Sequence, residues 1–233
     1  MKYKSIKHAT FLERPNRFIA RVLLDGALET VHVKNTGRCR ELLQPGAAVI
    51  LEEAGHPGRK TRYSLVAVYK GKMLVNIDSQ APNAVVYEAI QQKLLPEFGA
   101  ITRLTKEVRY RGSRFDLYYE TEEKRGFIEV KGVTLEEKGI ALFPDAPTER
   151  GAKHLQELTA AVREGYEGCI FFLIQMKGPQ RFQPNKVMDP DFTEALQVAK
   201  KAGVRVLAYD SVVTEDSIVM EEPALVEVCA YHG

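Results

Sequence analysis

Three side chains that could bind a metal and cleave a phosphodiester lie close together in the sequence. Asp116 ends the stretch Ser113-Arg-Phe-Asp, and Glu129-Val-Lys131 follows after twelve residues. Residues two apart on an extended strand point to the same face, so Glu129 and Lys131 should project together. If the intervening chain is a hairpin that turns midway, Asp116 lies opposite Glu129. A shift of one residue in register would move Asp116 off that face.

These residue types suit metal-dependent phosphodiester hydrolysis. Two carboxylates can bind Mg²⁺ or Mn²⁺ and leave positions for water and phosphate. The metal acts as a Lewis acid, while Lys131 orients or deprotonates the attacking water. The simpler interpretation is an ion pair on a solvated strand, but Asp116 lies between Phe115 and Leu117, where a charge needs partners. We predict that Asp116, Glu129 and Lys131 are catalytic and that the two carboxylates bind the metal.

Four further residues are candidates for this site. Glu88, on an expected helix, is a candidate third metal ligand, with a solvent-facing glutamate as the alternative. Arg150, Lys153 and His154 lie three and four residues apart on one helical face, which predicts a phosphate-binding surface. The competing interpretation is a solvated helix face paired to nearby glutamates, with His154 as a metal ligand a minor option.

The elements that must position these residues fall into two parts. Residues 14–78 contain short strand-like segments separated by turns such as Asp25-Gly26, with one helical or irregular piece near 38–43. Five short strands in so few residues suit a small barrel. We therefore predict an OB-like barrel over residues 1–80.

Residues 81–233 show a different pattern. Asn83 is the expected N-cap of a helix that ends before Pro96, and Thr148 is the expected N-cap of a second helix. Strands are expected near 105–111, 115–120, 126–131, 169–175 and 204–209, with a third helix over 191–202. A long crossover between apolar strands indicates parallel pairing. The order predicts an α/β sandwich over residues 81–233.

The charges are distributed unevenly along the chain, although the net charge is only +2. Residues 1–80 hold 14 basic and 7 acidic side chains, a net +7, whereas residues 81–233 carry a net −5. Basic grooves in OB-like barrels bind nucleic-acid backbones. The predicted nucleic-acid-binding residues, besides those on the second helix, are Arg17, Lys34, Arg38, Arg40, Arg62 and Arg114. DNA, single-stranded or duplex, is the expected partner, and RNA is a second candidate.

Several classes of protein are excluded by composition and motifs. No apolar stretch approaches 18 residues, so we expect no membrane-spanning segment. The three cysteines Cys39, Cys169 and Cys229 are far apart and odd in number, which argues against a disulfide framework and favours a cytoplasmic location. The sequence contains neither the Gly-x-Gly-x-x-Gly motif of dinucleotide-binding folds nor a phosphate-binding loop that ends in Gly-Lys-Ser/Thr, so no nucleotide cofactor is expected. The oligomeric state is open.

The motif and element order resemble the PD-(D/E)xK nuclease superfamily, with Asp116, Glu129 and Lys131 as the signature and Phe115 where a proline is usual. The whole chain also resembles the sugar fermentation stimulation protein (SfsA) family. The matching stretches are Asn35-Thr-Gly-Arg, Glu41-Leu-Leu-Gln-Pro-Gly, Ser113-Arg-Phe-Asp, Glu129-Val-Lys-Gly-Val-Thr-Leu and Phe143-Pro-Asp-Ala-Pro-Thr-Glu-Arg-Gly-Ala-Lys-His-Leu. The resemblance implies an OB-like domain, a nuclease-like domain, DNA binding and a regulatory role in sugar (maltose) metabolism.

Two functions therefore compete at this point. The first is a Mg²⁺-dependent nuclease that uses the barrel to hold its substrate. The second is a non-catalytic DNA-binding regulator of sugar metabolism, in which the nuclease-like site is vestigial or binds a structural metal. A carbohydrate-binding barrel is a third idea, but no aromatic-rich motif supports it.

Overall fold

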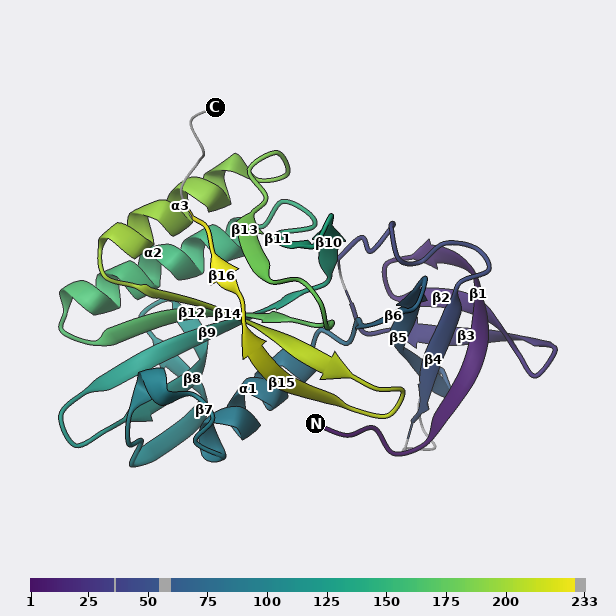
Figure 1. Cartoon of the computed structure of the whole chain (residues 1–233), viewed down its shortest axis with the longest axis horizontal. Helices are drawn as coiled ribbons and strands as arrows, with labels where there is room; N and C mark the ends of the chain where they lie inside the picture. The colour runs from purple at the N-terminus through teal and green to yellow at the C-terminus, as the bar shows by residue number, and fades with distance from the viewer. Residues whose placement is uncertain (36, 55–59, 229–233) are drawn as a thin grey trace.

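The computed structural model describes residues 1–35, 37–54 and 60–228, and its first part is a small barrel (Figure 1). The barrel strands are β1 (Ile6–Asn16), β2 (Ile19–Leu24), β3 (Ala27–Val33), β4 (Ala48–Glu53) and β5 (Tyr63–Lys70), followed by β6 (Met73–Asn76). They pair in the order β3-β2-β1-β4-β5-β6, and an additional pairing of β3 with β5 closes a five-stranded barrel. The expectation of an OB-like barrel is confirmed.

Strand β1 is the element of the barrel that the sequence did not predict. It begins at Ile6, and only Phe11 among its eleven residues is fully buried. Strand prediction rests on regular alternation of buried and exposed residues, and β1 lacks that alternation because register shifts interrupt its pairing with β2. The expected five strands are therefore six.

The second part is an α/β domain built on a six-stranded mixed sheet. Its strands are β7 (Arg103–Tyr110), β8 (Ser113–Glu120), β9 (Arg125–Val133), β12 (Glu167–Ile174), β14 (Arg205–Val213) and β15 (Ile218–Pro223). The order is β15-β14-β12-β9-β8-β7, in which β12 runs parallel to both β9 and β14. A smaller sheet contains β10 (Leu135–Glu137), β11 (Ile140–Phe143), β13 (Arg181–Pro184) and β16 (Leu225–Val226).

Helices cover both faces of the large sheet. Helix α1 (Ala81–Gln91) packs over one face, with the short helix η1 (Pro96–Phe98) after it. Helices α2 (Glu149–Arg163) and α3 (Pro190–Lys201) pack over the other face and lie side by side in Figure 1. Apolar strands such as β12 are buried on both faces, as parallel strands between helices require. The α/β sandwich is confirmed.

The helix starts test two sequence predictions. Thr148 is the N-cap of α2, and its side chain accepts a hydrogen bond from the Gly151 amide at 3.0 Å. The predicted cap of α1 is wrong, because that helix begins at Ala81 after Gln80. Asn83 therefore lies in the first turn, where its side chain is available for another contact.

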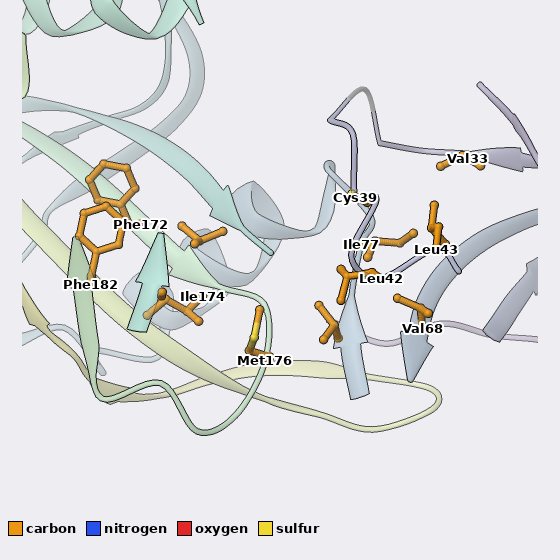
Figure 2. Close-up of a cluster of buried hydrophobic side chains, with 14 of the residues drawn as sticks. Val33, Cys39, Leu42, Leu43, Val68, Ile77, Phe172, Ile174, Met176 and Phe182 are labelled. Atoms are coloured by element: carbon orange, nitrogen blue, oxygen red, sulfur yellow. The ribbon is translucent and has the colours of Figure 1, made fainter. Parts of the chain in front are cut away.

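The barrel and the α/β domain share one hydrophobic core. Figure 2 shows Met176 between two groups of apolar side chains, one from the barrel region that includes Ile77 and one from the α/β domain that includes Phe172. Polar side chains also connect the two parts at this junction: the Gln175 amide group donates a hydrogen bond to Asn76 Oδ1 at 2.8 Å. The two parts are thus held together by burial and by buried hydrogen bonds.

The cysteines and the helices bear on the expected environment of the protein. Cys39 and Cys169 are buried free thiols, and Cys229 lies outside the described residues. Among the residues that the structure describes, no helix is long and apolar enough to cross a membrane.

Candidate active site

The hairpin of β8 and β9 has the register that the sequence predicted. Its pairs run from Glu120 with Arg125 to Leu117 with Ile128, so the next positions along the two strands are Asp116 and Glu129. The backbone ladder ends there. In its place the Val130 amide donates to Asp116 Oδ2 at 2.8 Å, so a side chain substitutes for a backbone acceptor.

Asp116 also leaves the ladder on its other side. Strand β7 pairs Lys106 with Leu117 and Val108 with Phe115, which skips the position opposite Asp116. The skipped residue, Glu107, has a φ of 56°, the left-handed conformation that is uncommon outside glycine. The register is the same on both sides of this position, so one pair is missing and no residue is inserted. Asp116 therefore has no ladder partner on either neighbouring strand, and its side chain reaches the Val130 amide where β8 and β9 separate.

Glu129 is the most buried charged residue of the candidate site, with 2% of its surface exposed. Its Oε1 accepts hydrogen bonds from Lys131 Nζ at 2.6 Å and from His154 Nδ1. Burial acts to raise the pKa of Glu129, but the His154 hydrogen bond and the Lys131 charge outweigh it and hold that pKa below its usual range. Glu129 is therefore kept ionised inside the protein.

The second oxygen of Glu129 has no partner. Glu129 Oε2 is buried and makes no hydrogen bond with any part of the chain that the structure describes. A buried carboxylate oxygen without a partner is costly, because it has lost water and gained nothing in return. Such an atom is therefore a sign that something else binds there.

Asp116 is held in place from helix α1. Asn83 Nδ2 donates to Asp116 Oδ1 at 2.7 Å, so both oxygens of this carboxylate accept a hydrogen bond. Burial, followed by the negative charge of Glu129, raises the pKa of Asp116 to about 6. Two carboxylates that repel each other in a buried place are stabilised by a cation between them, so Asp116 and Glu129 fit a divalent metal.

His154 has a different environment from the one that the sequence suggested. It is 4% exposed, its Nδ1 lies against Glu129 Oε1, and Arg150 Nε donates to its Nε2 at 3.4 Å. With Nε2 accepting, Nδ1 carries the proton that Glu129 accepts. A buried ring with both nitrogens engaged is placed to orient Glu129, and not to contact a phosphate directly.

Glu88 does not join the carboxylate pair. Its Oε2 lies 2.7 Å from the terminal ammonium of Met1, and nearly half of its side chain is exposed. The residue of α1 that does reach the site is Asn83, which contacts Asp116. The predicted third ligand therefore has a separate partner in this structure.

The predicted basic residues of the barrel divide into paired and open ones. Lys34 lies 3.1 Å from buried Asp78 and 3.2 Å from Glu52, so it is already neutralised. Arg62 pairs with Glu53 but keeps 68% of its side chain exposed. Arg62 could therefore still reach a phosphate, whereas Lys34 stabilises the barrel.

The remaining predicted barrel residues lie on its surface. Arg17 stacks over the Phe18 ring at 4.8 Å, and Arg38 and Arg40 are exposed. The backbone amide of Arg38 donates to Asp145 Oδ2 at 2.9 Å, which ties this loop to the α/β domain. The neighbouring Thr36 lies outside the described residues.

The three predicted basic residues of the α/β domain, Arg114, Arg150 and Lys153, are exposed. Arg114 Nη1 lies 3.6 Å from Glu107, and Lys153 Nζ lies 3.9 Å from Glu157. More than half of each lysine or arginine side chain is exposed, so these are weak surface pairs. Arg114 and Lys153 are therefore available to a ligand.

Sequence reasoning missed two residues that shape the site. Asn83 looked like a helix cap, and its contact with Asp116 spans 33 positions, so no local signal could reveal it. Arg14 has no local signal that separates it from the other basic residues of the barrel. Its guanidinium donates to the carbonyl oxygens of Asn35, Gly37 and Arg38 at 2.6 to 2.9 Å, and these hydrogen bonds fix the backbone of the loop that carries Arg38.

The fold and the site define a protein in which an OB barrel is joined to an α/β domain with a buried pair of carboxylates. A family model described as "SfsA N-terminal OB domain" matches residues 12–77, and one described as "Sugar fermentation stimulation protein RE domain" matches residues 80–217. The chain belongs to the sugar fermentation stimulation protein family.

Individual relatives match along nearly the whole chain. The sugar fermentation stimulation protein homolog of Alkaliphilus oremlandii is 56% identical over 225 residues, covering 94% of this chain and 96% of the relative. The homolog of Ruminiclostridium cellulolyticum is 51% identical over 222 residues, covering 95% and 97%. The structure of Pyrococcus furiosus SfsA in complex with Ca²⁺ superposes with a TM-score of 0.90 at 30% identity, covering 97% of this chain and 98% of that one.

Proposed function

We propose that this protein is a metal-dependent nuclease that binds DNA and hydrolyses its phosphodiester bonds with the PD-(D/E)xK signature of Asp116, Glu129 and Lys131. The observation that carries the proposal is Glu129 Oε2, a buried carboxylate oxygen without a hydrogen-bond partner among the described residues, in a site where Asp116 carries a second carboxylate. This arrangement is unfavourable for an empty protein and favourable for one that binds a cation.

Asp116 and Glu129 are the residues that would hold Mg²⁺ or Mn²⁺. Carboxylate oxygens are the ligands that these hard cations prefer. When bound, the metal supplies Lewis-acid stabilisation of the phosphate and lowers the pKa of bound water. The Ca²⁺ complex of the Pyrococcus furiosus relative supports a divalent cation in this family, because Ca²⁺ takes the same class of ligand.

The chain's own residues have separate tasks in this proposal. Lys131 Nζ, 2.6 Å from Glu129 Oε1, fixes that carboxylate and places an ammonium where it can neutralise a phosphate oxygen or orient a water. His154 holds the same oxygen from the other side. Asp116, with a pKa of about 6, is largely ionised above pH 7 and is then ready to act as a ligand.

The barrel supplies substrate binding in this scheme. Arg17, Arg38, Arg40 and Arg62 are exposed on it, and the Asp145 contact fixes the loop of Arg38 to the α/β domain. Cationic side chains bind the backbone with a strong dependence on salt. We place the protein in the cytoplasm, where DNA and RNA substrates are found.

A non-catalytic role is the second candidate, as a DNA-binding regulator in sugar (maltose) metabolism. One observation favours it: no group of three or more histidine, cysteine, aspartate or glutamate side chains in a metal-binding arrangement occurs among the described residues. Lys131 and His154 also share Glu129 Oε1, which leaves few oxygens for a metal. Binding without turnover would be the expected behaviour.

Cleavage and binding assays on the full chain separate these roles. Single-stranded, duplex and flapped DNA and RNA are incubated with Mg²⁺ or Mn²⁺, and the cleaved fraction is compared for wild type, Asp116→Asn and Lys131→Ala. Lys200→Ala, which is exposed at the end of α3, is the matched control. Cleavage by wild type and the control but not by the site variants is expected. Binding with no cleavage of any substrate would rule out the nuclease and leave the regulator.

A further inference from the structure

The β7–β8 hairpin carries an unusual density of positive charge. Residues 103–114 contain five lysines and arginines but a single acidic residue, Glu107. The hairpin forms the edge of the large sheet, and it leads directly to Asp116 on β8. Charged residues on an edge strand can simply prevent edge-to-edge association, so the charge alone does not establish a ligand.

The alternation of side chains shows which charges share a face. Val108, Tyr110 and Phe115 pack into the core on the α2 side of the sheet. Arg109 and Arg114 alternate with them and must point to the opposite face, which is the α1 side. Lys106 precedes Glu107, whose left-handed backbone interrupts the alternation, and it lies on this same side.

The position of Lys106 follows from its contact with α1. Its Nζ lies 3.8 Å from the centre of the Tyr87 ring, and Tyr87 belongs to that helix. Helix α1 packs over β9 and β15 and leaves the hairpin end of this face open. The Arg114 side chain, for example, is 56% exposed. Lys106, Arg109 and Arg114 therefore form an open cationic surface, which we call the hairpin face.

Two of these cations oppose each other within the sheet. Arg109 and Arg114 are direct partners in the β7–β8 ladder. Like charges directly opposite on neighbouring strands are destabilising. Glu107 relieves the repulsion only on the Arg114 side, and the Arg109 side chain makes no hydrogen bond or ion pair with any described residue. An arrangement that costs stability and lies in the open is explained most simply by an anionic ligand.

The hairpin is also fixed in place. Arg111 and Tyr110, near its tip, both contact the Glu164 carboxylate at the end of α2, and Lys153 Nζ donates to the Gly112 carbonyl at 3.4 Å. A fixed arm loses little conformational freedom on binding. The hairpin face is thus a preorganised surface whose nearest functional neighbour is Asp116, two residues beyond Arg114.

We propose that the hairpin face binds phosphates of the nucleic-acid strand on one side of the cleaved bond. The inference rests on the proposed nuclease function and adds a binding surface on the α/β domain that is separate from the barrel. Glu129 and Lys131 face the α2 side, where His154 contacts Glu129, whereas Asp116 contacts Asn83 of α1. The hairpin face therefore adjoins the site at Asp116, where β8 and β9 separate. The ligand is the backbone, and no base sequence is read.

The test uses Arg109→Gln and the double variant Arg109→Gln/Arg114→Gln in the full chain. Binding of a labelled duplex and of a single strand of the same sequence is measured in EDTA, over a series of salt concentrations. We expect weaker binding by both variants. The slope of log affinity against log salt concentration should also become shallower, by about 0.9 per lost phosphate contact for the duplex and by about 0.7 for the single strand. Arg163→Gln, exposed on α2 over the other face, is the matched control.

Unfolding measurements on the same variants separate binding from structure. Arg109→Gln removes half of a like-charged pair, so its unfolding midpoint should equal or exceed that of wild type while its affinity falls. If wild type binds but both variants keep its affinity and salt slope, the hairpin face is not a binding surface. If wild type binds neither probe, the proposed function itself fails.

Discussion

Replacing Asp116 by asparagine should stabilise the protein while abolishing the proposed metal site. Both oxygens of Asp116 accept hydrogen bonds, from Val130 and Asn83, and an asparagine can keep both contacts if the Asn83 amide group rotates. The variant lacks only the negative charge, which lies buried near Glu129. Residues that serve a ligand are often destabilising in its absence, and Asp116 should show this clearly.

The magnitude follows from the pKa. Asp116 has a pKa of about 6 in the folded protein against an ordinary value of 3.8, and each pKa unit corresponds to about 1.4 kcal/mol. Because the folded state holds the proton more tightly, the contribution of Asp116 to stability is fully present below pH 3.8 and is lost as the pH rises through about 6. At pH 8 the ionised side chain should cost up to about 3 kcal/mol, which asparagine avoids.

Urea unfolding in EDTA at a series of pH values between 4 and 8 provides the assay. The free energy of unfolding of Asp116→Asn should exceed that of wild type at pH 8, and the difference should shrink as the pH falls. Asp191→Asn, exposed in the first turn of α3, controls for the loss of one negative charge. Parallel curves for wild type and Asp116→Asn at every pH would refute the argument that burial and Glu129 raise this pKa.

Adding a divalent cation to the same experiment tests the ligand. A cation that binds only the folded protein stabilises it in proportion to the logarithm of its concentration over the dissociation constant. Mg²⁺ or Ca²⁺ should therefore raise the unfolding free energy of wild type at pH 8 and leave Asp116→Asn nearly unchanged. Equal stabilisation of both proteins would place the cation elsewhere.

Two further variants test the surroundings of the carboxylate pair. His154→Gln should lower the Mn²⁺ affinity and cost about 1–3 kcal/mol of stability, because Glu129 loses a buried hydrogen bond. Calorimetric titration measures the affinity, and urea unfolding measures the stability. An unchanged Mn²⁺ affinity would show that His154 does not orient Glu129. Gly132→Ala should destabilise the protein by about 1–3 kcal/mol, since its Cβ would lie 2.2 Å from Gln175 Oε1. Gly112→Ala, whose Cβ would lie 3.3 Å from the flexible Glu157 side chain, should unfold near the wild-type midpoint. Similar unfolding midpoints for the two variants would contradict this reasoning.

Much of the architecture could be predicted from local patterns. The hairpin of β8 and β9 has the predicted register because a polar loop at its centre and alternating apolar residues specify it. The cap at Thr148 and the apolar strand β12 followed from equally local rules. Strand β1 was missed because its irregular pairing removes the alternation on which prediction depends.

The candidate site shows the division most clearly. By its residue types and their spacing, the sequence determined that Asp116, Glu129 and Lys131 belong to one hairpin, because two-residue periodicity and register are local properties of strands. Only the tertiary structure decided that Asn83 holds Asp116 and that His154 holds Glu129, across 33 and 25 positions of the chain. These contacts depend on how helices α1 and α2 pack against the sheet, and helix packing is set by the whole core.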